Sequence, residues 1–227
     1  MTDTTGASNN PGSRLRAALA ILAALLLLAG ILWLTQRGED ESTRVEALDA
    51  PAECGPVLRH PTEGAGAHVN KATYTAAPPS FGDHAPRWEV RAASFYDVQS
   101  RPAVPVLVHN LEHGYNIVWY DQTVLDDDQA LRRLQAIASK YDDLDGSPDP
   151  ANAIIAAPWT AADGADFPRG MHYAFTHWYA DPDDRTRSRA DEAGLTKYCS
   201  DISADLVHTW MADHPLAEAP EGFPDLL

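Results

Sequence analysis

An unbroken apolar run near the N-terminus constrains the architecture of this chain more than any other feature. Residues 17–34, AALAILAALLLLAGILWL, carry no charge and no strongly hydrogen-bonding side chain. As a helix this run would span roughly 27 Å, close to the thickness of the hydrocarbon core of a bilayer. It lacks the polar face of a core helix, and Trp33 stands at its end, where an interfacial aromatic residue is favoured. We therefore expect residues 17–34 to form a single transmembrane helix.

The charges around this run predict its orientation. Arg14 and Arg16 precede it, whereas Glu39, Asp40 and Glu41 follow it, which favours a cytoplasmic N-terminus. We expect a disordered segment at 1–16, a linker at 35–53 and an extracytoplasmic domain at 54–227, held at the cell membrane. The alternative is a cleaved signal peptide, but the apolar part of a signal peptide is shorter, about 7–15 residues.

The charge of the expected exported part argues against nucleic-acid binding. The formal net charge of the chain is −16. Three basic residues and one acid lie in the first 37 positions, which leaves 14 basic against 32 acidic residues, a balance of −18. Such a surface repels phosphate groups. The only partner that the sequence predicts is the membrane, through residues 17–34.

The two cysteines, Cys54 and Cys199, stand near opposite ends of the expected exported domain. In an oxidising compartment such a pair is more often a disulfide than two free thiols. The alternative is a pair of buried, reduced cysteines. Neither residue belongs to a CxxC motif, so a redox-active dithiol is not expected.

Secondary-structure patterns predict an α+β fold, in which helices pack on a small sheet. Residues 54–103 contain many Pro, Gly and Ala and are expected to be loops with short extended pieces. No internal repeat is visible. The remaining patterns predict strands at 104–110, 115–121, 152–159 and 171–179, a helix at 126–143, and a second helix at 203–214 that Ser203 caps.

The segment H-N-L-E-H-G at 109–114 carries the main functional signal. Its spacing formally matches H-x-x-E-H, the inverted zinc-peptidase motif, in which a helix presents both histidines to the metal. Pro105, Gly114 and the surrounding valines and isoleucine instead favour a strand, a turn and a second strand. His109 and His113 can still share one face of such a structure and are candidate ligands for Zn²⁺ or Cu²⁺.

A third ligand would come from elsewhere in the chain. His84 in F-G-D-H-A-P is the first candidate, and His172, His177 and Met171 are weaker ones. Histidines that hydrogen-bond to backbone carbonyl groups and hold loops together are the alternative explanation for this group.

These residues also carry a resemblance. A-P-P-S-F-G-D-H-A-P followed by L-V-H-N-L-E-H-G, behind one apolar helix, resembles a bacterial membrane-anchored family, domain of unknown function 3105. The family is built around P-P-x-S-G-x-H and H-N-L-E-H-G, and the resemblance extends over about residues 54–215. Phe81 stands where the family has its serine, and Ser80 lies one position earlier. The resemblance implies a membrane-anchored architecture and no particular activity.

Three functions are therefore open. The first is a membrane-anchored exported domain in which His84, His109 and His113 bind copper or zinc without catalysis. The second is a metal-dependent hydrolase with Glu112 as the general base. The third is a structural or interaction module of the cell envelope. The sequence favours the first and does not indicate a protein partner.

Overall fold

The computed structural model describes residues 52–90, 92–141, 153–183 and 191–222. The expected disordered segment 1–16, the transmembrane helix 17–34 and nearly all of the linker 35–53 lie outside the described residues. Among the residues that are described, no helix has the length and apolar character needed to cross a membrane. Ala47–Leu227 forms one compact unit.

The described residues of this unit form a five-stranded sheet and three longer helices. In chain order its elements are β1 (Leu58–Pro61), α2 (Val104–Glu112), β2 (Asn116–Tyr120), α3 (Gln122–Leu125), α4 (Asp128–Ala138), the 3-10 turn η1 (Ser139–Tyr141), β3 (Ile154–Pro158), β4 (Tyr173–Tyr179), β5 (Ala193–Cys199), α5 (Ala204–Asp213) and the 3-10 turn η4 (Leu216–Glu218).

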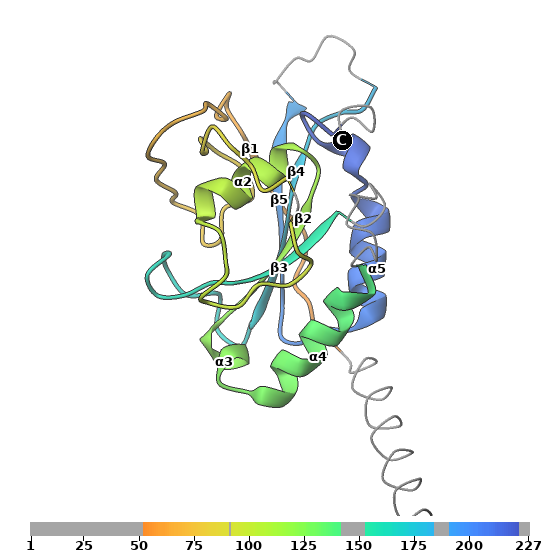
Figure 1. Ribbon diagram of the computed structural model, residues 1–227. Coiled ribbons are helices and arrows are strands. Elements are labelled where there is room, and N and C mark those ends of the chain that lie inside the picture. Colours follow the sequence, from red (N-terminus) through yellow and green to blue (C-terminus); the bar gives the residue numbers. More distant parts are fainter. Residues whose placement is uncertain (1–51, 91, 142–152, 184–190, 223–227) are drawn as a thin grey trace, which may run out of the picture. The chain divides into compact units, whose positions relative to one another are not determined.

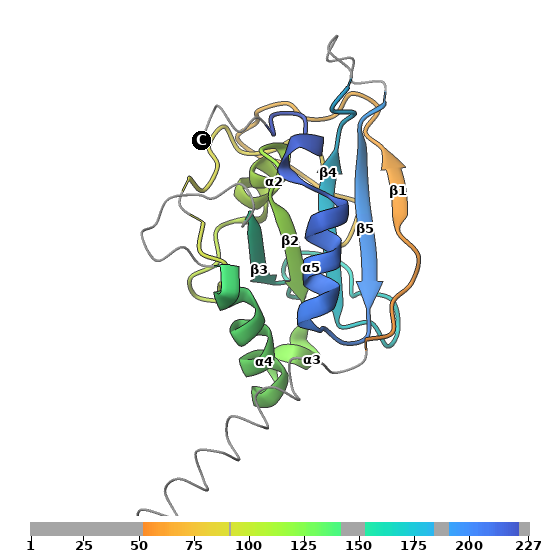
Figure 2. The same cartoon turned by 90° about the vertical axis from the view of Figure 1, so that its right-hand side faces the viewer.

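The strands form a mixed sheet in the order β1-β5-β4-β2-β3. Strands β2 and β3 are parallel, with Asn116 opposite Ile154, and the other neighbouring pairs are antiparallel. Helix α2 covers one face of the sheet, whereas α4 and α5 cover the other (Figures 1 and 2). The domain therefore has three layers, and the expected α+β class is confirmed.

Alternating side chains of the central strand β2 serve both hydrophobic cores. Ile117 and Trp119 belong to the core under α2, and Val118 and Tyr120 belong to the core under α4 and α5. This alternation follows from the two-residue period of a strand. Because both faces of β2 are covered, the strand is buried throughout, and it forms a rigid support for the helices on either side.

Most of the predicted elements are present. The strands expected at 115–121, 152–159 and 171–179 correspond to β2, β3 and β4, and the helix expected at 126–143 corresponds to α4 followed by η1. Ser203 caps α5 as predicted, since its hydroxyl accepts a hydrogen bond of 3.1 Å from the Leu206 amide. Each of these elements has a strong local signal.

The strand predicted at 104–110 is wrong, because residues 104–112 form helix α2. Pro105 lies in the first helical turn, where its missing N–H leaves no helical hydrogen bond unmade. Eight of the nine residues of α2 are buried, and burial of Leu107 and Leu111 against the sheet outweighs the weak helix preference of valine. Tertiary packing therefore decided this element.

Strands β1 and β5 were not predicted. The β5 sequence AGLTKYC contains Gly194 and Lys197 and does not alternate clearly between apolar and polar residues, yet the strand lies between β4 and β1. Strand β1 has four residues, all exposed, and therefore shows no hydrophobic pattern. Both strands owe their structure to pairing with a neighbour that is distant in the sequence.

The predicted disulfide between Cys54 and Cys199 is confirmed, so the alternative of two reduced cysteines is wrong. The bond joins the beginning of the described domain to the end of β5. Backbone hydrogen bonds flank it on both sides, from Gly55 N to Tyr198 O at 2.9 Å and from Ser200 N to Glu53 O at 2.8 Å. The N-terminal part of the domain is thus held against the sheet covalently and by hydrogen bonds.

Candidate metal centre

Helix α2 carries the H-x-x-E-H segment as a helix, not as the strand, turn and strand expected from the sequence. Residues three and four apart lie on the same side of a helix, so His109, Glu112 and His113 point in a common direction. The Nε2 atoms of the two histidines are 3.2 Å apart. Gly114, the last residue of H-N-L-E-H-G, has a positive φ of 91° and follows the end of the helix.

Four side chains from two parts of the chain converge at this helix: His68, His84, His109 and Glu112. One ligand atom from each lies within 4.8 Å of those of the other three. The ring centroids of His84 and His109 are 4.5 Å apart, and that of His68 lies 4.9 Å and 4.8 Å from them. This cluster, of three imidazoles and one carboxylate, could hold a metal ion.

The distances within the cluster suit a shared ion. Oε2 of Glu112 lies 3.0 Å from Nε2 of His84 and 3.9 Å from Nε2 of both His68 and His109. Two ligands of a tetrahedral zinc ion, each bound at about 2.0–2.1 Å, are about 3.3 Å apart. The separations within the cluster, which reach up to 4.8 Å, lie on both sides of this value, so the side chains would have to move inwards to bind one ion together.

Backbone carbonyl groups orient the two buried imidazoles. Nδ1 of His84 donates to Gly82 O at 2.9 Å, and Nδ1 of His109 donates to Ala85 O at 2.7 Å. A carbonyl oxygen can only accept, so each Nδ1 must carry the proton. Histidine ligands of metals are commonly held in this way, which leaves Nε2 free to coordinate. Both Nε2 atoms are the ones that face Glu112.

His68 is the residue of the cluster that the sequence did not reveal. Its loop runs beside His84, with hydrogen bonds from Val69 N to His84 O at 2.8 Å and from His84 N to Ala67 O at 3.0 Å. Oδ1 of Asp83 accepts further bonds from the amides of Gly66 and Ala67. Nothing in the local pattern marks this histidine, and only the backbone pairing brings it to the site.

The four ligands differ in exposure. The His68 side chain is 52% exposed, whereas that of Glu112 is 3% exposed and the imidazoles of His84 and His109 are also buried. A buried carboxylate is costly unless a positive charge compensates it. A bound cation or a protonated His84 would each compensate this charge, and His68 is the exposed member of the cluster.

The pKa values of the histidines follow from this burial. For His84, burial alone would lower the pKa, but the hydrogen bond and the charge of Glu112 outweigh it and raise the pKa above the ordinary value. Burial lowers the pKa of His109 to about 4 and also lowers that of His113. His109 and His113 are thus neutral near pH 7, the form in which imidazole binds a metal.

His113 lies at the edge of the cluster rather than within it. Its Nε2 is close to His109, but it does not belong to the four residues whose ligand atoms converge. Its ring packs against Trp88 at a tilt of 33°, with a centroid distance of 4.3 Å, and its Nε2 lies 3.8 Å from Oε2 of Glu221. Of the three leading candidates, His84 and His109 are therefore in the cluster and His113 adjoins it.

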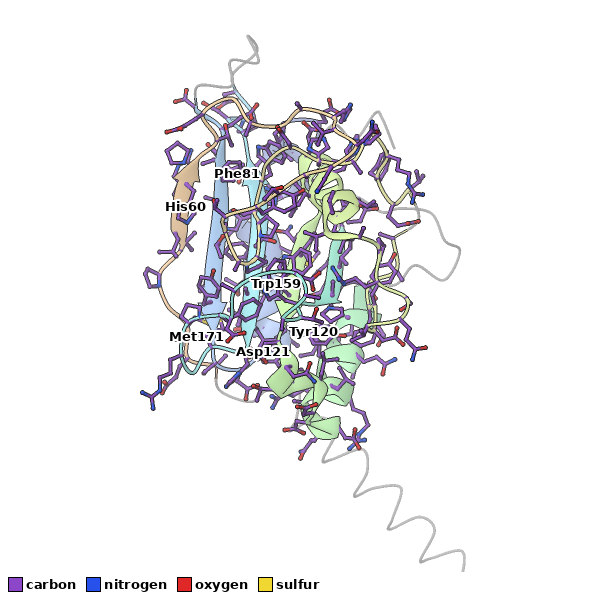
Figure 3. The ribbon with its side chains drawn as sticks, turned by 90° about the vertical axis from the view of Figure 1, so that its left-hand side faces the viewer. His60, Phe81, Tyr120, Asp121, Trp159 and Met171 are labelled. Atoms are coloured by element: carbon purple, nitrogen blue, oxygen red, sulfur yellow. A yellow bond between two sulfur atoms is a disulfide. The ribbon has the colours of Figure 1, made fainter. Side chains whose placement is uncertain are left out.

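The weaker candidates lie elsewhere. Nδ1 of His172 is 3.0 Å from Oδ2 of Asp121, and His177 stacks on His214 with a centroid distance of 5.6 Å. Met171 packs against the core under α2. Figure 3 shows Met171 and Asp121 at one end of the sheet, far along the strands from Phe81, which precedes the His84 loop. The structure does not bring these side chains to the cluster.

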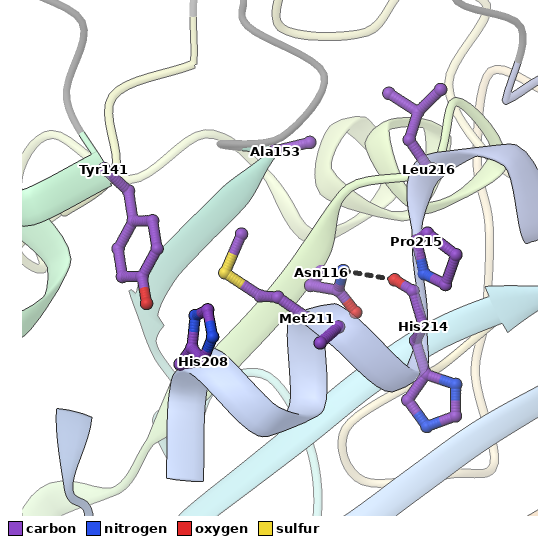
Figure 4. A pocket seen from close by; sticks show the side chains of 10 residues that line it. Asn116, Tyr141, Ala153, His208, Met211, His214, Pro215 and Leu216 are labelled. Carbon is purple, nitrogen blue, oxygen red and sulfur yellow. Dashed lines mark hydrogen bonds between the residues drawn. The ribbon is translucent and has the colours of Figure 1, made fainter. Parts of the chain in front are cut away.

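A cavity of about 270 Å³ lies beside α5 and shares no residue with the cluster (Figure 4). Its wall includes Asn116, whose Nδ2 donates to His214 O at 2.9 Å, together with His208 and Met211 of α5. Tyr141 and Ala153 also line the cavity. Because it contains none of the converging ligands, the cavity is separate from the candidate metal centre.

Fold and site together define the class of this protein: a disulfide-linked α+β domain with a buried histidine–glutamate cluster beside a helix. The chain belongs to the family described as Protein of unknown function (DUF3105), whose model matches residues 67–187. The resemblance seen in the sequence is thus confirmed, and the matched region contains all four residues of the cluster. No curated protein and no solved structure matches the chain.

Proposed function

We propose that this protein binds one transition-metal ion, Zn²⁺ or Cu²⁺, through His68, His84, His109 and Glu112. The observation that carries the proposal is the orientation of two buried imidazoles. Their Nδ1 atoms are hydrogen-bonded to backbone carbonyl groups, and their Nε2 atoms face one buried carboxylate. Nitrogen and oxygen ligands of this kind suit zinc and copper.

Binding without turnover is the role that this ligand set favours. Catalytic zinc sites commonly use three protein ligands and keep one position for water, whereas four protein ligands close a tetrahedral site. Glu112 lies 3.0 Å from the His84 imidazole, which favours a role as fourth ligand over a role as a base beside a bound water. The protein would then store, sense or transfer the ion.

A metal-dependent hydrolase is the second candidate, and one observation favours it. The H-x-x-E-H segment is helical, with the Nε2 atoms of His109 and His113 3.2 Å apart, as two ligands of one ion would be. In that arrangement His113 is a ligand and Glu112 is the general base. The two functions therefore assign different ligands and can be separated by substitution.

The decisive experiment measures metal content. The full-length protein is loaded with Zn²⁺ or Cu²⁺ and dialysed, and the ion is counted by mass spectrometry. We expect one ion per chain, loss of the ion in His84→Ala and His109→Ala, and retention in His113→Ala. His172→Ala is the matched control, because this histidine has its own carboxylate partner away from the cluster.

The other outcomes are equally informative. Loss of the ion in His113→Ala with retention in Glu112→Gln would favour the hydrolase. A folded wild-type protein that retains no ion and whose melting temperature does not respond to Zn²⁺ or Cu²⁺ would refute metal binding. The histidines would then serve architecture, as in the envelope-module alternative.

The same proposal includes attachment to the membrane. Residues 17–34 are long and apolar enough to span a bilayer, and a disulfide such as Cys54–Cys199 persists mainly in oxidising compartments. Both support an extracytoplasmic domain on a single-pass anchor with a cytoplasmic N-terminus. A C-terminal alkaline phosphatase fusion should be active in cells. An inactive alkaline phosphatase fusion, together with an active cytoplasmic reporter fused at the same position, would contradict this topology.

A further inference from the structure

Asn110, the second residue of the H-N-L-E-H-G segment, makes a pair of reciprocal hydrogen bonds to one residue. Its Oδ1 accepts from Glu89 N at 3.0 Å, and its Nδ2 donates to Glu89 O at 3.0 Å. Asn110 is fully buried. A side-chain amide carries an acceptor oxygen next to an N–H donor. It therefore pairs with the backbone N–H and C=O of Glu89 in the way that a backbone peptide group would.

The segment that Asn110 holds is the one that orients the metal centre. Residues 85–89 include Ala85, whose carbonyl accepts from His109 Nδ1, and Trp88, whose ring packs against His113. The start of this segment is tied to α2 by a hydrogen bond from Ala85 N to Pro105 O at 3.1 Å. Asn110 ties its end to the same helix.

We propose that Asn110 is a positioning residue of the metal centre. By fixing both ends of residues 85–89 on α2, the structure keeps the Ala85 carbonyl in line with His109 and holds His109 Nε2 towards Glu112. The inference rests on the proposed metal binding. Groups that orient histidine ligands in this way typically change metal affinity 10- to 100-fold when they are removed.

The proposal differs from a purely structural role in what it predicts. A buried amide that only stabilises the fold would lower the melting temperature when it is replaced and leave the properties of the bound ion unchanged. A positioning residue also changes the geometry of the site. The test therefore needs a spectroscopic readout of the ion and one of the His109 ring.

The first variant, Asn110→Ala, removes both hydrogen bonds. The second, Asn110→Ser, keeps a hydroxyl that can still form a hydrogen bond, and it serves as the test if Asn110→Ala does not fold. Asn116→Ala is the matched control, because Asn116 is also buried and its Nδ2 also donates to a backbone carbonyl, that of His214. All are made in the full-length protein. Zn²⁺ affinity is measured by competition with a chelator, and the Cu²⁺ form is examined by electron paramagnetic resonance.

We expect Zn²⁺ to bind 10- to 100-fold more weakly in Asn110→Ala, with a smaller loss in Asn110→Ser and a change below twofold in Asn116→Ala. The Cu²⁺ spectrum should change in the Asn110 variants and stay the same in the control. Affinities and spectra equal to the wild type in both Asn110 variants would overturn the proposal.

A metal-free measurement separates this inference from the proposed function. In ¹⁵N-histidine spectra of the wild type, His109 should carry its proton on Nδ1, and Asn110→Ala should weaken that preference. If the wild type binds no metal, the proposed function and the metal role of Asn110 fail together. The spectra then still decide whether Asn110 orients His109, and an unchanged His109 signal refutes that as well.

Discussion

Nε2 of His84 lies 3.0 Å from Oε2 of Glu112, with both side chains buried. Because Nδ1 of His84 donates to Gly82 O, a proton on Nε2 makes this ring an imidazolium, and the pair becomes an ion pair. A metal ion would replace that proton. Under the proposed metal binding, the proton and the ion would each compensate the charge of Glu112.

The first prediction concerns the charge of Glu112. In Glu112→Gln the pKa of His84 should fall, because the hydrogen bond and the charge of this carboxylate raise it, beside smaller contributions from the Gly82 carbonyl and the charge of Glu221. Metal affinity should fall as well, since an amide is a poorer ligand than a carboxylate. Proton titration by nuclear magnetic resonance and chelator competition measure the two effects. Glu221→Gln, a half-exposed site beside His113, is the control and should affect both only slightly. A His84 pKa that does not move would contradict this account of the pair.

The second prediction concerns the turn that ends helix α2. Gly114 has a φ of 91°, and a Cβ atom there would lie 2.7 Å from Leu216 O. Gly114→Ala should therefore destabilise the fold by about 1–3 kcal/mol or more, through backbone strain and this contact. Gly170→Ala is the matched control, because Gly170 has a φ of 78° with nothing within 4 Å of the added atom. Urea unfolding measures the free energy that each variant loses. Equal losses in the two variants would show that the contact with Leu216 does not add to the backbone strain.

The third prediction concerns the disulfide between Cys54 and Cys199, which are 145 positions apart. Closing a loop of this length restricts the unfolded chain, and its loss should lower the free energy of unfolding by about 2–5 kcal/mol. The double variant Cys54→Ser, Cys199→Ser tests this by urea unfolding. The reduced wild type is the control and should lose a similar amount. A double variant as stable as the oxidised wild type would contradict the prediction.

The fourth prediction concerns acid stability. Burial, with a smaller contribution from His214, lowers the pKa of His177 to about 3, far below its value of about 6.5 in an unfolded chain. Below pH 6.5 the unfolded state therefore binds a proton that the folded state does not. The contribution of neutral His177 to the free energy of unfolding is therefore complete above pH 6.5. It is lost as the pH falls towards 3, at up to about 1.4 kcal/mol per pH unit.

His177→Gln cannot titrate, so its free energy of unfolding should fall less steeply between pH 6.5 and pH 4.5 than that of the wild type. Only the slopes are compared, because the substitution also changes packing. His60→Gln, on the exposed strand β1, is the control for the same substitution away from the core. Parallel slopes for His177→Gln and the wild type would refute this assignment.

The sequence predicted the features that depend on neighbours in the chain. The β-branched and aromatic residues of β2, the Ser203 cap of α5 and the cluster of acids at the start of α4 are local signals, and the corresponding elements are present. The pairing of the two cysteines was predicted from their number and the expected compartment. His84, His109 and Glu112 were recognised because each stands in a distinctive short motif.

Tertiary structure alone decided the form and the membership of the site. Valines at 104, 106 and 108 favour a strand by themselves, but burial against Trp119 and Trp178 stabilises a helix there. His68 has no distinctive neighbours, and it joins the cluster through backbone pairing with His84. Short-range preferences are worth tenths of a kcal/mol per residue, whereas burying a large side chain contributes about 1.5–3 kcal/mol. Long-range packing therefore determined how the H-N-L-E-H-G segment is presented.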